Sequence, residues 1–244
     1  MPYGVIINSS SVLIGGIIGT LVGKYLSAEF KTQITYVFGL CSMAMGIFTL
    51  DEMQNMPAVV FAVVLGTGIG LVFKLGKWID KAGMTMQKPV GSIFKNNFEH
   101  GMTNDEYISL LVTAIVLFCA SGTGIYGALD AGMTGDHTIL LSKSILDLFT
   151  AAIFAANIGY VISVIAVPQF IILILLFMLA QVIIPMTTPD MVADFRAAGA
   201  FLMIATGFRM VKLIEFPIAD MIPAMVLAMP FSYLWTTWII PLLN

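Results

Sequence analysis

The chain has 244 residues, of which 59% are hydrophobic and only 10% are charged, with a mean hydropathy of +0.98 and a formal net charge of −3. A soluble globular domain carries roughly a quarter charged residues, so this composition leaves too few charges to cover a water-facing surface. It excludes a soluble domain and predicts an all-α integral membrane protein, because a helix satisfies its backbone hydrogen bonds within its own segment.

Crossing the hydrocarbon core of a bilayer takes about 20 mostly apolar residues. Eight runs meet this condition, and they lie at 4–25, 32–50, 56–76, 107–128, 139–161, 163–185, 195–213 and 217–242. The chain start lacks the basic stretch of a secretory signal, so the first run is expected to be a retained span. No polar loop separates the fifth run from the sixth, and a seven-span or re-entrant arrangement therefore stays open.

The positive charges predict the orientation of these spans. On the eight-span scheme, nine of the eleven Lys and Arg residues fall on one side, in the connections that hold Lys24, Lys31, Lys74, Lys77, Lys81, Lys88, Lys95, Arg209 and Lys212. The positive-inside rule makes that side cytoplasmic and places both termini outside. Arg196 is the exception, and Lys143 falls at or within a span.

The connection 77–106 is the one sizeable polar segment. It mixes Trp78, Ile93 and Phe94 with lysines, which is typical of a helix lying on the membrane surface. A solvated loop anchored by its lysines explains the same composition, and both interpretations stay open.

Two stretches of the chain resemble each other. The sequence 56–62 has the pattern of 222–228, and each follows an acidic connection and opens an apolar span. The first three spans (1–76) therefore resemble the last three (163–244), with 107–161 as central spans outside the repeat. An offset of five spans inverts one copy relative to the other, and such inverted repeats recur in secondary transporters.

The fourth span contains the most unusual segment, in which Ser121, Gly122, Thr123 and Gly124 follow one another. The segment formally contains the dinucleotide-binding pattern of glycines, but that motif needs a preceding strand, so nucleotide binding is excluded. A Gly-rich run of this kind either breaks a membrane helix beside a cavity or lets helices pack closely, and both interpretations stay open. The glycines Gly15, Gly19 and Gly23, and likewise Gly66 and Gly70, favour close packing.

Lys143 and Asp147 lie four residues apart in the fifth span, so a helix places them on one side within pairing distance. Charges inside a membrane segment are costly and commonly face a bundle interior or water. Asn157 shares this polar side only loosely. Arg209, near the cytoplasmic end of the seventh span, is a further candidate for holding a substrate anion, although snorkelling to the interface also explains it.

Other polar residues are given a structural interpretation. The run Asn8-Ser9-Ser10-Ser11 is expected to be the interfacial start of the first span, and the alternative is that its hydroxyls and amide line a pathway. The charged and ionisable residues of the outer connections are expected to be solvated loop residues: Asp130, Asp136, His137, Asp190 and Asp194. No spacing of His, Cys or acids indicates a metal site, a cofactor or a catalytic set, so no enzymatic activity is expected.

Several motifs carry a family resemblance. They are Leu117-Phe118-Cys119-Ala120-Ser121-Gly122-Thr123-Gly124-Ile125, Gly132-Met133-Thr134-Gly135-Asp136, Ser142-Lys143-Ser144 and Ala193-Asp194-Phe195. Through them the chain resembles the bacterial membrane family catalogued as domain of unknown function 554, with the YqgA-like and YdfK-like proteins. The resemblance implies a location in the bacterial inner membrane, and it implies no substrate and no catalytic residues.

The resulting hypothesis is a small secondary transporter for a small polar or anionic solute, coupled to H⁺ or Na⁺. Its site is predicted to contain Ser121, Gly122, Thr123, Gly124, Lys143, Asp147, Asn157 and Arg209, with Asp147 as the residue that takes the coupling ion or proton. A channel and a non-transporting scaffold or regulatory membrane protein are the alternatives. The expected partners are the lipid bilayer and the solute, with no nucleic acid, and the glycine faces also allow a homo-oligomer.

Overall fold

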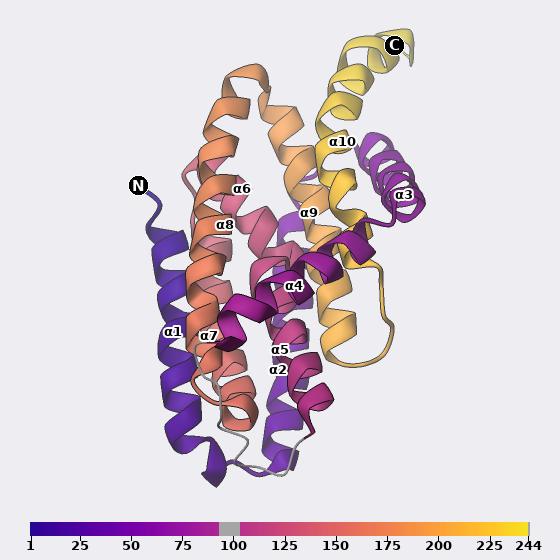
Figure 1. The fold of residues 1–244 in the computed structure, drawn as a ribbon. Helices are drawn as coiled ribbons and strands as arrows, with labels where there is room; N and C mark the ends of the chain where they lie inside the picture. The colour runs from indigo at the N-terminus through magenta and orange to yellow at the C-terminus, as the bar shows by residue number, and fades with distance from the viewer. Residues whose placement is uncertain (93–102, 244) are drawn as a thin grey trace. The chain divides into compact units, whose positions relative to one another are not determined.

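The computed structural model describes residues 1–92 and 103–243, and Figure 1 shows their course. The α-helices are α1 (Tyr3–Val22), α2 (Ala28–Leu50), α3 (Met56–Phe73), α4 (Leu75–Ser92), α5 (Asn104–Cys119), α6 (Gly122–Thr134), α7 (Thr138–Ile158), α8 (Val161–Ile183), α9 (Pro189–Met210), α10 (Ile222–Leu234) and α11 (Ile240–Leu243). Short 3-10 turns occur at Gly23–Tyr25, Ile184–Met186 and Ile218–Met221, and a π-helical turn at Trp235–Ile239. The described residues form no strand.

Within residues 1–92 and 103–243, eight helical segments are long and apolar enough to cross a membrane, as predicted. They are Tyr3–Val22, Ala28–Leu50, Met56–Phe73, Glu106–Thr134, Thr138–Ile158, Val161–Met186, Pro189–Met210 and Ile218–Leu242. The fifth and sixth are separate helices, because the chain turns at Gly159, whose φ of 76° and ψ of −159° belong to a conformation essentially restricted to glycine.

The fourth span is broken, which decides one of the alternatives left open by its sequence. Helix α5 ends at Cys119, and α6 begins at Gly122, near the middle of Glu106–Thr134. The hydroxyl of Ser121 caps α6 by accepting a hydrogen bond from the N–H of Gly124 at 3.1 Å. A serine N-cap starts a new helix because its oxygen replaces a missing backbone acceptor.

The connection after the third span begins with a helix rather than a loop. Val90 of α4 is 7% exposed and belongs to a core with Leu111 and Ile115 of α5. On the exposed side, the Lys81 ammonium lies 5.6 Å from the ring centre of Trp78. Residues 93–102 of the predicted connection lie outside the described residues. A location of α4 on the membrane surface stays a prediction.

The chain folds into two compact units. The first contains Met1–Thr35 and Lys77–Met178, and the second contains Tyr36–Gly76 and Leu179–Asn244. Both are therefore built from segments far apart in the sequence. The first copy of the predicted repeat, 1–76, is divided between them, and the inverted repeat is not confirmed.

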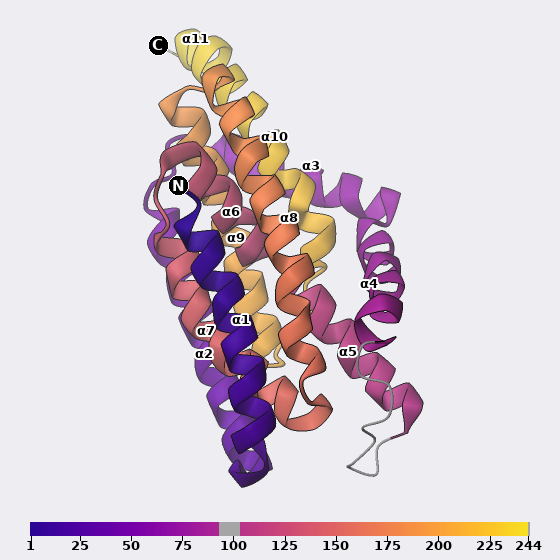
Figure 2. The same cartoon turned by 60° about the vertical axis from the view of Figure 1, so that its left-hand side comes forward.

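In the first unit, α1 packs along α7, as Figures 1 and 2 both show. Contact occurs through the small-residue face: a Cβ on Gly15 would lie 2.2 Å from the carbonyl oxygen of Leu148, and one on Gly19 would lie 2.1 Å from that of Ala152. Small residues let membrane helices approach this closely, since lipid offers no hydrophobic drive for association. The packing interpretation of these glycines is confirmed.

In the second unit, α3 packs against α10 and α2 against α9. A Cβ on Gly66 would lie 2.5 Å from the Cα of Ala224, and one on Gly46 would lie 2.8 Å from the carbonyl oxygen of Ala200. The rings of Phe61 and Phe231 add a tilted contact, with their centres 5.0 Å apart. Close helix contacts thus fix the positions of the polar side chains in this unit too.

Candidate functional site

A cluster of polar side chains lies within the first unit, where α1, α7 and α8 meet. We call it the Asp147 cluster, and its members are Asn8, Lys143, Asp147 and Gln169. Asn8 and Gln169 are fully buried, and Lys143 and Asp147 are 3% and 7% exposed. All four lie within predicted membrane spans. Their side chains are therefore shielded from both water and lipid, and they face the interior of the helix bundle.

The carboxylate of Asp147 is the centre of the cluster. Its Oδ2 pairs with the Lys143 ammonium and accepts hydrogen bonds from Asn8 Nδ2 at 2.9 Å and Gln169 Nε2 at 3.2 Å. Gln169 Nε2 also donates to Asn8 Oδ1 at 2.9 Å. One oxygen thus receives donors from three helices, an arrangement that suits an ionised carboxylate.

The amide oxygen of Gln169 is different, since it is buried and has no hydrogen-bond partner among the described residues. A buried acceptor without a donor costs about 1–3 kcal/mol. Buried polar atoms of native proteins are nearly always paired, and the exceptions are often explained by function or by a bound water or ion. The Gln169 oxygen can therefore accept a hydrogen bond from a bound molecule.

The broken fourth span lies next to Lys143. A Cβ on Gly124 would lie 3.1 Å from Lys143 Cε and 2.9 Å from Ser121 Oγ, so glycine leaves space for the lysine side chain to pass. The first turn of a helix leaves N–H groups without an intrahelical acceptor, here those of Gly122 and Thr123. The helix dipole adds positive potential at this end. An ammonium and a helix N-terminus thus come close together inside the unit.

Two predicted site residues lie elsewhere. Asn157 is exposed, and its amide bonds to the carbonyl oxygen of Ile153 at 3.3 Å on its own helix. Arg209 is exposed at the end of α9, in the second unit. The structure therefore brings Ser121, Gly122, Thr123 and Gly124 together with Lys143 and Asp147, and it leaves Asn157 and Arg209 out of this group.

Sequence reasoning missed two members of the cluster. Asn8 was expected at an interfacial helix start, but it is fully buried and donates to Asp147. Gln169 was not singled out, although an amide within an otherwise apolar span beside Pro168 was a usable signal, because polar groups in membrane helices usually face the bundle interior.

The expectation of solvated charges in the outer connections is wrong for three residues. Asp130 and Asp194 are fully buried and His137 is 4% exposed. The ring centre of His137 lies 3.7 Å from that of Tyr3, and burial lowers the pKa of this histidine. Asp194 accepts hydrogen bonds from the N–H groups of Gln54 and Asn55 at the start of α3. Helix ends in a membrane protein also lie against neighbouring helices, so charged residues there can be buried.

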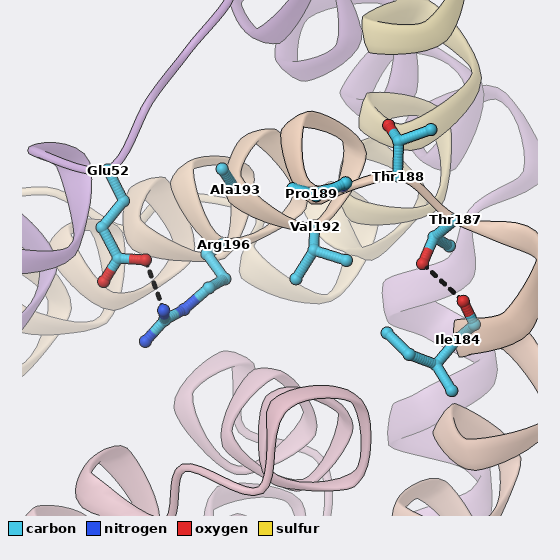
Figure 3. A pocket seen from close by; sticks show the side chains of 8 residues that line it. All are labelled: Glu52, Ile184, Thr187, Thr188, Pro189, Val192, Ala193 and Arg196. Carbon is cyan, nitrogen blue, oxygen red and sulfur yellow. Dashed lines mark hydrogen bonds and ion pairs between the residues drawn. The ribbon is translucent and has the colours of Figure 1, made fainter.

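The second unit contains a cavity of 390 Å³, shown in Figure 3. It is lined by Glu52, Ile184, Thr187, Thr188, Pro189, Val192, Ala193 and Arg196. Glu52 and Arg196 point toward each other and form an ion pair whose side chains are 34% and 17% exposed. The lone arginine of the predicted outer side is thus neutralised locally, and a pair this exposed contributes little to stability.

The comparisons with known proteins cover nearly the whole chain. The model of the family described as "Protein of unknown function (DUF554)" matches residues 3–233. The chain belongs to the DUF554 family. One DUF554 relative is "Uncharacterized protein YqgA" of Escherichia coli (strain K12), with 44% identity over 98% of this chain and 99% of the relative. Another is "Uncharacterized membrane protein YdfK" of Bacillus subtilis (strain 168), with 24% identity over 92% of this chain and 93% of the relative. No solved structure matches this DUF554 chain.

Proposed function

We propose that this DUF554 protein is a small secondary transporter of the bacterial inner membrane. It moves a small polar or anionic solute, coupled to H⁺ or Na⁺. The observation that carries the proposal is the buried pair of Lys143 and Asp147 beside a broken membrane span. Discontinuous spans whose half-helix N-termini point at anionic groups are a recurrent feature of transporter sites.

Charge balance supports an anionic solute. Without solute, the carboxylate of Asp147 neutralises Lys143, so the buried site carries no net charge. An anion that binds Lys143 and the first N–H groups of α6 takes over this neutralising role. Asp147 must then lose its own charge by taking a proton, or be balanced by Na⁺, because an unpaired buried charge is strongly unfavourable. Solute and cation therefore bind together.

The orphaned oxygen of Gln169 supports a solute that also carries a hydrogen-bond donor. Its Oε1 is buried within the same cluster and accepts no hydrogen bond from the described residues. A hydroxyl or ammonium group of the solute, or the proton that Asp147 takes up, would satisfy it. Sites that hydrogen-bond a solute discriminate strongly against analogues that lack the matching group.

The test is uptake into liposomes that contain the purified protein. The probes are labelled small carboxylates, phosphate, sulfate and amino acids, offered under an imposed pH or Na⁺ gradient. We expect gradient-driven uptake of one class, its loss in Asp147→Asn and Lys143→Met, and its retention in Asp190→Asn, an acid outside the cluster. Coupled uptake that survives Asp147→Asn contradicts the role of this residue. Currents far above transporter turnover, independent of any gradient coupling, identify a channel instead.

A further inference from the structure

The second unit repeats the central contact of the Asp147 cluster. Asn8 Nδ2 donates to Asp147 Oδ2 at 2.9 Å in the first unit, and Asn55 Nδ2 donates to Asp194 Oδ2 at 2.9 Å in the second. The two partners are 139 residues apart in both pairs. The step along the chain from Asn8 to Asn55 is therefore the same as the step from Asp147 to Asp194.

The surrounding sequence repeats as well. Asn8 is followed by the pattern Gly-Thr-x-x-Gly at 19–23, and Asn55 is followed at the same distance by Gly-Thr-x-x-Gly at 66–70. Both glycine patterns mediate close helix contacts. By their Asn–Asp contacts, helices α1 and α7 of the first unit correspond to α3 and α9 of the second. The glycine partners differ, because Gly19 packs on α7 whereas Gly66 packs on α10. This correspondence relates spans that are two apart, and an even offset leaves both copies in the same orientation. It therefore differs from the inverted repeat expected from 56–62 and 222–228.

The two acids differ in their counter-charge. One turn before Asp147 stands Lys143, but the matching position before Asp194 is Asp190. Asp194 is fully buried and accepts hydrogen bonds at 2.9 Å from the N–H groups of Gln54 and Asn55 and from the Asn55 amide, which are all neutral donors. The nearby N-terminus of α3 supplies the equivalent of about half a positive charge. About half of the carboxylate charge remains to be balanced.

Three oxygens surround one point beside this carboxylate. Asn55 Nδ2 lies 2.9 Å from Asp194 Oδ2, 3.4 Å from Ser232 Oγ and 3.3 Å from Thr236 Oγ1. Ser232 is fully buried, whereas Thr236 is exposed, so the group reaches the surface of its unit. Thr236 lies in the π-helical turn Trp235–Ile239, a deformation that is frequent at functional sites.

We propose that these residues form a Na⁺ site. The ion takes the place of the Asn55 amide nitrogen among the oxygens of Asp194, Ser232 and Thr236, and the rotated amide offers its own oxygen as a further ligand. Carboxylate, amide carbonyl and hydroxyl oxygens suit a hard cation. A single carboxylate matches a single charge, which favours a monovalent ion over Ca²⁺ or Mg²⁺. As a second cation site of the transporter, in addition to Asp147, this assignment rests on the proposed function, but Na⁺ binding itself is testable alone.

The experiment measures the Tm of the purified full-length protein in detergent against NaCl, with KCl replacing NaCl at constant ionic strength. A ligand that binds only the native state raises Tm in a concentration-dependent way. We expect a rise specific to Na⁺, and an apparent affinity at least tenfold lower in Ser232→Ala and Thr236→Val. Both variants keep the hydrogen bonds of Asp194 to Gln54 and Asn55 and should therefore fold.

The matched control is Thr67→Val, since the hydroxyl of Thr67 bonds only to its own helix, to the carbonyl oxygen of Val63 at 2.6 Å. It should keep the full Na⁺ response. Absence of a Na⁺-specific rise in the unaltered protein, or a full response in both Ser232→Ala and Thr236→Val, overturns the site. Gradient-driven uptake without a Na⁺ response refutes only the Na⁺ site, and a Na⁺ response without uptake refutes only the transport function.

Discussion

Removing either member of the buried pair should destabilise the protein far more than removing both. Lys143→Met leaves the Asp147 carboxylate buried without its counter-ion, and Asp147→Asn does the same to the ammonium. Breaking a buried pair costs about 3–5 kcal/mol. For a chain of this length, 1 kcal/mol corresponds to roughly 2–4 °C in Tm. Each single variant should therefore melt about 6–20 °C below the unaltered protein.

The double variant with Met at 143 and Asn at 147 should regain much of that loss. The double variant buries no charge. The amide oxygen of its new asparagine can still accept the hydrogen bond that Asn8 Nδ2 donates to Asp147 in the unaltered protein, at 2.9 Å. The ion pair of Glu52 and Arg196 provides the contrast, because its side chains are 34% and 17% exposed. Arg196→Met should cost only about 1 kcal/mol or less.

Unfolding can be followed with a thiol-reactive dye. Cys119 is 4% exposed and becomes accessible on unfolding, whereas the exposed Cys41 would react beforehand and is first replaced by serine. A double variant no more stable than the weaker single variant would refute the reasoning. That result would mean that the loss of stability in the single variants does not come from an unpaired buried charge.

Four further substitutions test the packing and the titration. Gly124→Ala places a Cβ 3.1 Å from Lys143 Cε and should cost about 1–3 kcal/mol, read as a lower Tm. Gly19→Ala places a Cβ 2.1 Å from a backbone oxygen of α7 and should cost about 3 kcal/mol or more, whereas Gly68→Ala, with nothing within 4 Å, should gain up to about 1 kcal/mol of helix propensity. Burial lowers the pKa of His137, so the unfolded chain binds its proton more readily. Tm should be independent of this residue well above pH 6.5 or so and fall as the pH drops below it, a fall that His137→Phe should reduce.

The sequence by itself determined the class of protein and the course of its spans. Apolar runs of sufficient length identify membrane helices, because each helix satisfies its own backbone hydrogen bonds and its length must match the bilayer. The pairing of Lys143 with Asp147 followed from helical periodicity, since both lie on one helix. The run from Ser121 to Gly124 indicated either a helix break or a close contact. Both occur, because Ser121 caps the new helix and Gly124 leaves space for the Lys143 side chain.

Only the tertiary structure decided which helices meet. Asn8 and Gln169 are 161 residues apart, and their contact depends on how the glycine faces of α1 seat against α7 and α8. The burial of Asp194 likewise depends on α3 docking against α9 and α10. The hydrophobicity of a helix indicates how much of its surface avoids water, and nearly the whole surface of a membrane helix does so. It therefore does not distinguish a face that meets lipid from one that meets another helix, and close packing of small residues makes that choice.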